Sequence, residues 1–333
     1  MSITTSLREA LDVIQYHDAN SDYTIDSRTF YLWAEWPHYK VLTEKYGETA
    51  DSNGDEIITV SELMEAQRIL HSEFPPISAD DRRIANGITN LFSRDMDSSG
   101  RLQAVGDLSA AADEIGDEAA DLLSPIFFAA YIKSSCLCSN DQPMSAALEA
   151  AIVNIGSSAV FYLNDVLLNS NSVAQVYAAA LLGEIGDERG IDPLVALSLE
   201  KPCSREFTIP ALIQIGDDAV ERAVSSSING LERADTEEDL ERNVTFLEAL
   251  VLEEDKADGV ALGRLFDYIT NPANDPTTQV VITVSIALAA TQTANPEIVA
   301  AIREKLEAIS VDQNCSEQLR NIATSVLTLL PAE

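Results

Sequence analysis

The sequence predicts an all-α protein in two parts, and three observations carry this prediction. Apolar residues make up 46% of the 333 residues but aromatic residues only 6%, so the core must be built mainly from Ala, Leu, Ile and Val. These aliphatic residues recur at helical spacing. Aspartate-rich loops interrupt the helical pattern in the first third, and a regular period of thirty residues follows after about residue 145.

The composition excludes several kinds of partner. The chain has 55 acidic and 21 basic side chains, a net charge of −34, which argues against nucleic acid and anionic membrane surfaces and favours cations or basic proteins. The longest apolar stretch, Val280 to Ala290, is too short to cross a bilayer, so we expect no membrane insertion. The first residues lack the apolar run of a signal peptide, so we expect a cytoplasmic protein, with an earlier-removed leader left open.

The strongest motif is a twelve-residue loop over residues 51–62. Oxygen-bearing side chains occupy positions 1, 3, 5, 9 and 12: Asp51, Asn53, Asp55, Thr59 and Glu62. Ca²⁺ takes six to eight oxygen ligands, here including the backbone carbonyl of Ile57 at position 7 and both carboxylate oxygens of Glu62. The loop resembles the EF-hand family, which implies bound Ca²⁺. Glu56 replaces the family's glycine at position 6, a departure that lowers the expected affinity.

A second loop of the same type covers residues 18–29. Its predicted ligands are the side chains of Asp18, Asn20, Asp22 and Asp26 and the carbonyl of Thr24. Two positions depart from the family, because Tyr23 holds position 6 and Thr29 holds position 12. The resemblance implies that the loops work as a pair, with Ile25 and Ile58, both at position 8, meeting in a short two-stranded bridge.

A third loop is predicted over residues 95–106. Its ligands would be the side chains of Asp95, Asp97 and Ser99 and the carbonyl of Arg101. Gly100 holds position 6, as the family requires, but Gly106 replaces the closing glutamate. A helix over residues 79–93 is expected to enter this loop. An acidic turn without metal is the alternative for any one such motif, and three of them in register favour calcium.

The remainder of the chain is repetitive. Ile155-Gly156-Ser157, Ile185-Gly186-Asp187 and Ile215-Gly216-Asp217 lie thirty residues apart, each between two amphipathic segments. Glycine is expected to end the first helix in a left-handed conformation, and the Asp or Ser after it to cap the second. Pro210 predicts that the first helix of the third copy is short or kinked.

The run from Tyr177 to Leu194 resembles the short HEAT repeat of bilin-lyase-like proteins. The resemblance covers about residues 145–333 and implies an α-solenoid of roughly five helix pairs and a closing helix. The predicted organisation is an EF-hand-like domain over residues 1–125, a connecting segment over 126–144 and the HEAT-like solenoid over 145–333.

No catalytic motif is found, so we expect a protein that is not an enzyme. The three histidines lie near no recognisable nucleophile, and no phosphate-binding glycine loop is present. The favoured hypothesis is a calcium-binding scaffold whose helical repeats bind a protein partner, with calcium either regulating or only stiffening the N-terminal part. The alternative is a bilin-lyase-like enzyme or chaperone that holds a tetrapyrrole in the groove of the repeats.

Overall fold

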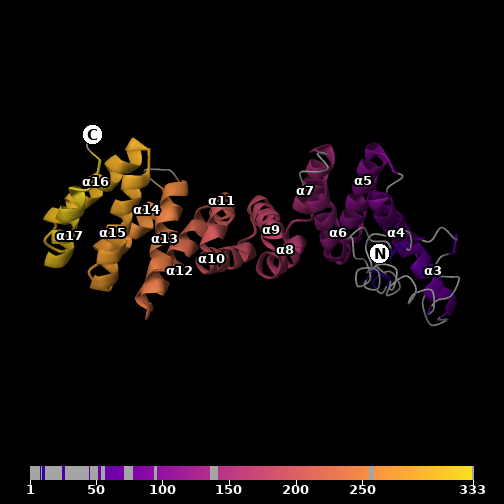
Figure 1. Ribbon diagram of the computed structural model, residues 1–333, viewed down its shortest axis with the longest axis horizontal. Coiled ribbons are helices and arrows are strands. Elements are labelled where there is room, and N and C mark those ends of the chain that lie inside the picture. The colour runs from indigo at the N-terminus through magenta and orange to yellow at the C-terminus, as the bar shows by residue number, and fades with distance from the viewer. Residues whose placement is uncertain are drawn as a thin grey trace. The chain divides into compact units, whose positions relative to one another are not determined.

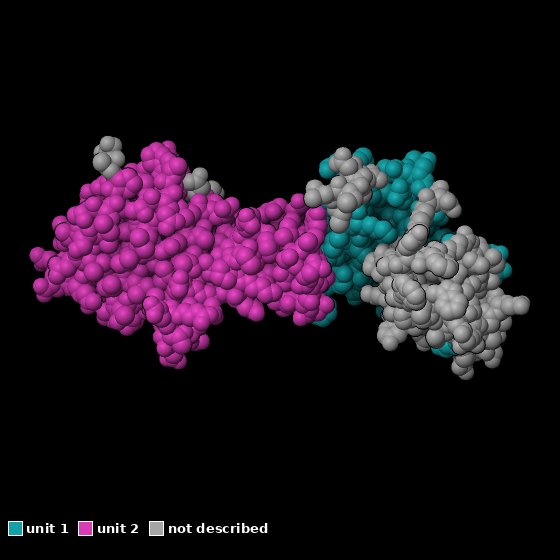
Figure 2. All heavy atoms as spheres, in the orientation of Figure 1, with its two compact units in different colours: residues 1–162 teal, residues 163–333 magenta. Residues whose placement is uncertain are grey.

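The computed structural model describes most of the chain after residue 57 and isolated residues before it. The described residues are 8, 10–11, 25–26, 45, 52–53, 57–70, 78–93, 96–135, 142–254 and 259–331. They belong to two compact units, residues 1–162 and 163–333 (Figure 2). The all-α prediction is confirmed, because the described elements are helices apart from one pair of two-residue strands.

Among the described elements of the first unit, two short strands are followed along the chain by the helices that Figure 1 labels from α3 onward. The strands are β1 (Ile25–Asp26) and β2 (Ile57–Ile58). The helices are α3 (Val60–Leu70), α4 (Ala79–Phe92), α5 (Ser98–Ile115), α6 (Asp117–Ser135), α7 (Gln142–Ile155) and the first half of α8 (Ser157–Asn169). The expected helix over residues 79–93 is confirmed as α4, and it buries Ile84, Ile88, Leu91 and Phe92 as the periodicity predicts.

The second unit continues α8 and consists of stacked helix pairs (Figure 1). Its further elements are α9 (Ser172–Ile185), η2 (Glu188–Gly190), α10 (Ile191–Glu200), η3 (Pro202–Ser204), α11 (Arg205–Ile215), α12 (Asp217–Glu232), α13 (Glu237–Glu254), α14 (Val260–Thr270), α15 (Pro276–Gln292), α16 (Pro296–Val311) and α17 (Glu317–Leu327). The first helices of successive pairs pack in order, α9 on α11, α11 on α13, α13 on α15 and α15 on α17, and α10, α12 and α14 pack in the same way.

Glycine corners join the two helices of several pairs. In the described part of the chain, the glycines with positive φ are Gly116 (86°), Gly156 (63°), Gly186 (69°) and Gly216 (128°). Each follows an isoleucine that ends a helix, and each N–H donates to the carbonyl four residues earlier. The sequence predicts that the Asp or Ser after each glycine caps the second helix. Asp217 and Ser157 are instead the first residues of their helices, so the prediction is wrong at these two corners. Asp187 does act as a cap, of η2, and its Oδ1 accepts from the N–H of Arg189 at 2.9 Å.

The corner at Gly116 was not predicted, and it changes the expected organisation. Ile115-Gly116-Asp117 has the repeat motif but lies forty residues before the next copy, outside the period of thirty. The helix pairs therefore begin with α5 and α6. Within the predicted connecting segment, residues 126–135 complete α6 and residues 142–144 begin α7. The units divide after Tyr162, later than the predicted start of the repeats.

Small side chains allow α9 and α11 to approach closely. Ala178 and Ala179 on α9 and Ala211 on α11 are buried. A Cβ atom built on Gly183 of α9 would lie 3.0 Å from the Cα of Ala211, closer than ordinary van der Waals contact. Pro210 lies inside α11, which has 11 residues against 14 in α9, so the prediction of a short helix is confirmed.

Arg205 connects three helices of the second unit. Its guanidinium donates from Nε to the carbonyl of Ser198 on α10 at 3.0 Å and from Nη1 to Oγ1 of Thr245 on α13 at 2.8 Å. It also lies 5.9 Å from the ring centroid of Phe246 on α13. Burial lowers the pKa of Arg205 and raises the pKa of nearby Glu248, although the attraction between the two charges opposes both shifts.

Replacing glycine by alanine should have opposite effects on stability at a corner between helices and inside a helix. Gly186→Ala places a side chain at φ 69° and should destabilise the second unit by about 1 kcal/mol. Gly263→Ala lies inside α14 with open space around the added Cβ, so it should stabilise by about 0.5–1 kcal/mol. Chemical denaturation measures both free energies of unfolding. Equal effects at the two sites would contradict the role of the corner.

Because the pKa of Glu248 is raised, we expect Glu248→Gln to become more stable relative to the wild-type protein as pH rises. When the pKa of a carboxyl is higher in the folded state than in the unfolded state, the folded protein loses stability as pH rises. The loss begins near the ordinary pKa of 4.5 and is complete above the pKa of the folded state. Glutamine lacks this loss, so the melting temperature of the variant relative to wild type should increase over that range and then level off. Glu253→Gln, at an exposed position of α13, controls for removing a charge from the same helix.

Candidate metal centre

The two predicted loops at residues 18–29 and 51–62 are joined where their position 8 residues pair. β1 and β2 are antiparallel, with Ile25 opposite Ile58 and Asp26 opposite Ile57. The predicted pairing of Ile25 with Ile58 is therefore confirmed. Ile58 is fully buried, as are Val60 and Leu63 of α3. The bridge thus anchors the end of the second loop to an apolar cluster at the start of α3.

The end of the second loop is also fixed by Thr59 and Glu62. Oε2 of Glu62 accepts from the backbone N–H of Thr59 at 3.1 Å and from its Oγ1 at 2.9 Å, and the N–H of Glu62 donates to Thr59 Oγ1 at 3.3 Å. This reciprocal pattern is a capping box, and it starts α3 at Val60. Glu62 is the residue that the sequence predicts as the closing ligand.

The carboxylate of Glu62 extends back toward the beginning of the loop. Its Oε1 accepts a hydrogen bond from Oγ of Ser52 at 3.2 Å, across ten residues of sequence. The last residue of the predicted loop therefore reaches back to its second residue. A carboxylate in this position can supply two oxygens to a cation held by the loop.

The predicted ligands are only partly within the described residues. Asn53, Ile57, Thr59, Glu62, Asp97, Ser99 and Arg101 are described, and for Asp26 the backbone alone is described. Asp18, Asn20, Asp22, Thr24, Asp51, Asp55 and Asp95 lie outside the described residues. Within the part of the chain that the structure describes, no three His, Cys, Asp or Glu side chains come together as a metal site.

The third predicted loop, residues 95–106, is wrong in conformation from Ser98 onward. Helix α5 begins at Ser98, so positions 4 to 12 of that loop are helical, and Ser99 and Arg101 lie in its first turn. Asp97 is the N-cap, and its Oδ1 accepts from the N–H of Gly100 at 2.7 Å. Successive helical residues point in different directions, so their oxygens cannot surround one ion as alternate loop residues do.

Gly100 has a different role from the one that the motif suggested. It is not among the described glycines with positive φ. A Cβ atom at this position would overlap the side chain of Met96, so glycine here permits close packing just before the helix. The calcium hypothesis is therefore restricted to the loops at residues 18–29 and 51–62.

Comparisons with known proteins give no family for this chain. No protein-family model matches the sequence, and the search of curated proteins found no match.

The length and hydrophobicity of the described helices bear on whether any of them could span a membrane. No single helix among them is both long and apolar enough to cross a bilayer. Helices α7 and α8 meet the length and composition requirements only when taken together, and they are bent by 113°.

The geometry at Glu62 predicts that Glu62→Gln separates metal binding from folding. Glutamine can still accept from Thr59 in a capping box, so α3 should start at the same residue. It removes the charge and one good ligand oxygen, so calcium affinity at residues 51–62 should fall about tenfold or more. Titration calorimetry measures the affinity, and Asp121→Asn, at an exposed position of α6, serves as the control. Unchanged affinity in Glu62→Gln would show that this loop is not the site.

Proposed function

We propose that this protein binds calcium through the paired loops at residues 18–29 and 51–62 and that its helical repeats bind a protein partner. The observation that carries the calcium part is the antiparallel pairing of Ile25 with Ile58. Two acidic loops whose equivalent residues pair in this way present their ligands in one compact domain. This arrangement supports an EF-hand-like pair.

Electrostatics support a stabilising role for calcium. The two loops contain seven acidic residues, Asp18, Asp22, Asp26, Asp51, Asp55, Glu56 and Glu62. Their mutual repulsion opposes the folded loops, and a divalent cation relieves it. Sensor proteins expose a groove rich in methionine when they bind calcium, whereas this chain has four methionines that are far apart in sequence, Met1, Met64, Met96 and Met144.

The helical stack is the proposed partner-binding part. Successive helix pairs pack on one another in the second unit, an arrangement that supports a HEAT-like α-solenoid. Several aliphatic side chains of this unit are exposed to solvent, including Leu168 (47%), Val173 (53%) and Val311 (76%). Together with the net charge of −34, these side chains favour a basic partner with apolar residues.

Calcium should stabilise the N-terminal part and leave the second unit unchanged. Both tryptophans, Trp33 and Trp36, lie between the two loops in sequence, so tryptophan fluorescence reports on this part alone. At one hundred times its dissociation constant, calcium should stabilise the folded state by about 2.7 kcal/mol and raise the melting temperature seen by fluorescence. The helical melting of a fragment containing residues 157–333, which begins with the whole of α8, should not shift when followed by circular dichroism.

The same samples test the stabilising role against a sensing role. A hydrophobic dye should show little change in fluorescence when calcium is added to the full chain, because no methionine-rich groove is expected. A strong calcium-dependent increase would favour a sensor. No shift in the tryptophan-detected melting at saturating calcium would contradict the calcium proposal itself.

A further inference from the structure

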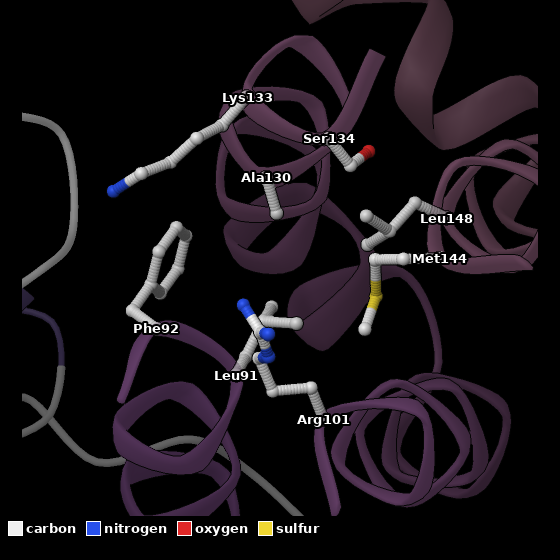
Figure 3. A pocket seen from close by; sticks show the side chains of 8 residues that line it. All are labelled: Leu91, Phe92, Arg101, Ala130, Lys133, Ser134, Met144 and Leu148. Carbon is white, nitrogen blue, oxygen red and sulfur yellow. The ribbon is translucent and has the colours of Figure 1, made fainter. Parts of the chain in front are cut away.

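A pocket of about 200 Å³ lies among α4, α5, α6 and α7 in the first unit (Figure 3). Its walls are mostly apolar and buried: Leu91 and Phe92 on α4, Ala130 on α6, and Met144 and Leu148 on α7. Arg101 on α5, Lys133 and Ser134 complete the lining. A cavity of about 150 Å³ with walls of this kind is large enough for benzene, so this pocket has room for a ring and a small substituent.

Arg101 brings a positive charge to this apolar pocket. In Figure 3 its guanidinium extends from α5 toward Leu91 and the interior of the pocket. Its Nε is buried among protein atoms, so a ligand in the pocket would meet the Nη atoms at the end of the guanidinium.

The position of Arg101 in its helix strengthens this argument. It is the fourth residue of α5, in the first turn, where the helix dipole disfavours a positive side chain. Arg303 offers a comparison, because its Nε is buried in the same way. Its guanidinium is held by a hydrogen bond from Nη2 to the carbonyl of Pro331. Arg101 is therefore placed against the preference of the helix dipole, as expected for a residue with a binding role.

The other polar groups of the pocket are already engaged. Oγ of Ser134 donates to the carbonyl of Tyr131 at 2.9 Å. The ammonium of Lys133 lies 5.8 Å from the ring centroid of Phe92, at the edge of the pocket in Figure 3. Arg101 is thus the group that can take up a charged ligand inside the pocket, and Lys133 adds positive potential at its edge.

We propose that this pocket binds a small apolar monocarboxylate, with its carboxylate on the Arg101 guanidinium and its ring or branched alkyl group against Leu91, Phe92, Met144 and Leu148. The planar guanidinium matches a carboxylate with two parallel hydrogen bonds. A phosphate fits less well, because it needs several donors and the pocket supplies one guanidinium among apolar walls. This site is independent of calcium and of the proposed repeat partner.

Binding of phenylacetate to the full chain tests the proposal, with phenylacetamide as a neutral ligand of nearly the same shape. We expect saturable binding of phenylacetate by NMR titration, with a dissociation constant in the millimolar range set by its small size. Phenylacetamide should bind at least tenfold more weakly. Titrations with calcium and with a chelator should agree, so failure of the calcium proposal leaves this result interpretable.

Three variants complete the test. Arg101→Met replaces the guanidinium by an unbranched apolar side chain without charge and should weaken phenylacetate binding at least tenfold while leaving the amide unaffected. Ala130→Leu fills the pocket and should abolish binding of both ligands. Arg222→Met, whose arginine pairs with Asp192 at 2.9 Å in the second unit, removes the same charge elsewhere and should bind as wild type does.

Two results would overturn the assignment. One is equal affinity for the acid and the amide in the wild-type protein, which would mean that Arg101 does not recognise charge. The other is the absence of saturable binding by the wild-type protein, which would mean that water, rather than a carboxylate, satisfies Arg101. Both comparisons use the wild-type chain, so they hold even if a variant fails to fold.

Discussion

The helical architecture depends on a glycine that can adopt positive φ between two helices. At Gly116, Gly156, Gly186 and Gly216 the chain leaves one helix and enters the next within one to five residues, a reversal that few other residues permit without strain. At Gly116 and Gly216 the second helix packs back on the first, α6 on α5 and α12 on α11. The repetition of this corner places equivalent helices in register, so α9, α11 and α13 pack in succession. Small residues then determine how closely they approach, as Gly183 does against Ala211.

Local signals explain which parts of the fold could be predicted. The helix pairs from residue 145 onward follow from the Ile-Gly motif and from apolar periodicity, both readable within one segment. The corner at Gly116 carries the same motif, but its spacing of forty residues concealed it among copies thirty apart. The third loop was misassigned because Asp-x-Asp-x-Ser-Gly suits two structures. An aspartate that begins a calcium loop and an aspartate that caps a helix both accept backbone N–H groups, and Asp97 does the latter.

The candidate sites differ in how much of them a sequence can show. Ile25 and Ile58 could be matched because each holds the same position in its loop, and their pairing follows from the register. Arg101 entered the prediction only through its backbone carbonyl, as a calcium ligand. The apolar residues that line the pocket with it, Leu91, Met144 and Leu148, belong to two other helices, α4 and α7, and no local pattern connects them. The sequence did hold one clue, a basic residue four positions after a good helix N-cap, in the first turn, where acidic residues are preferred.

The strong negative charge of the chain gives the two sites opposite requirements. Calcium is attracted by the potential of the whole protein, so the two loops still lie in a favourable field although Tyr23 and Glu56 replace the glycine at position 6. An anion is repelled by the same potential and must be held by short-range contacts. The pocket at Arg101 has the features that this requires: buried apolar walls that lower the local dielectric, a planar guanidinium, and Lys133 at the edge. Screening by salt should therefore weaken calcium binding and favour entry of a carboxylate, because salt reduces the long-range field more than it reduces contacts inside a pocket. The two sites would then respond to ionic strength in opposite directions on one chain.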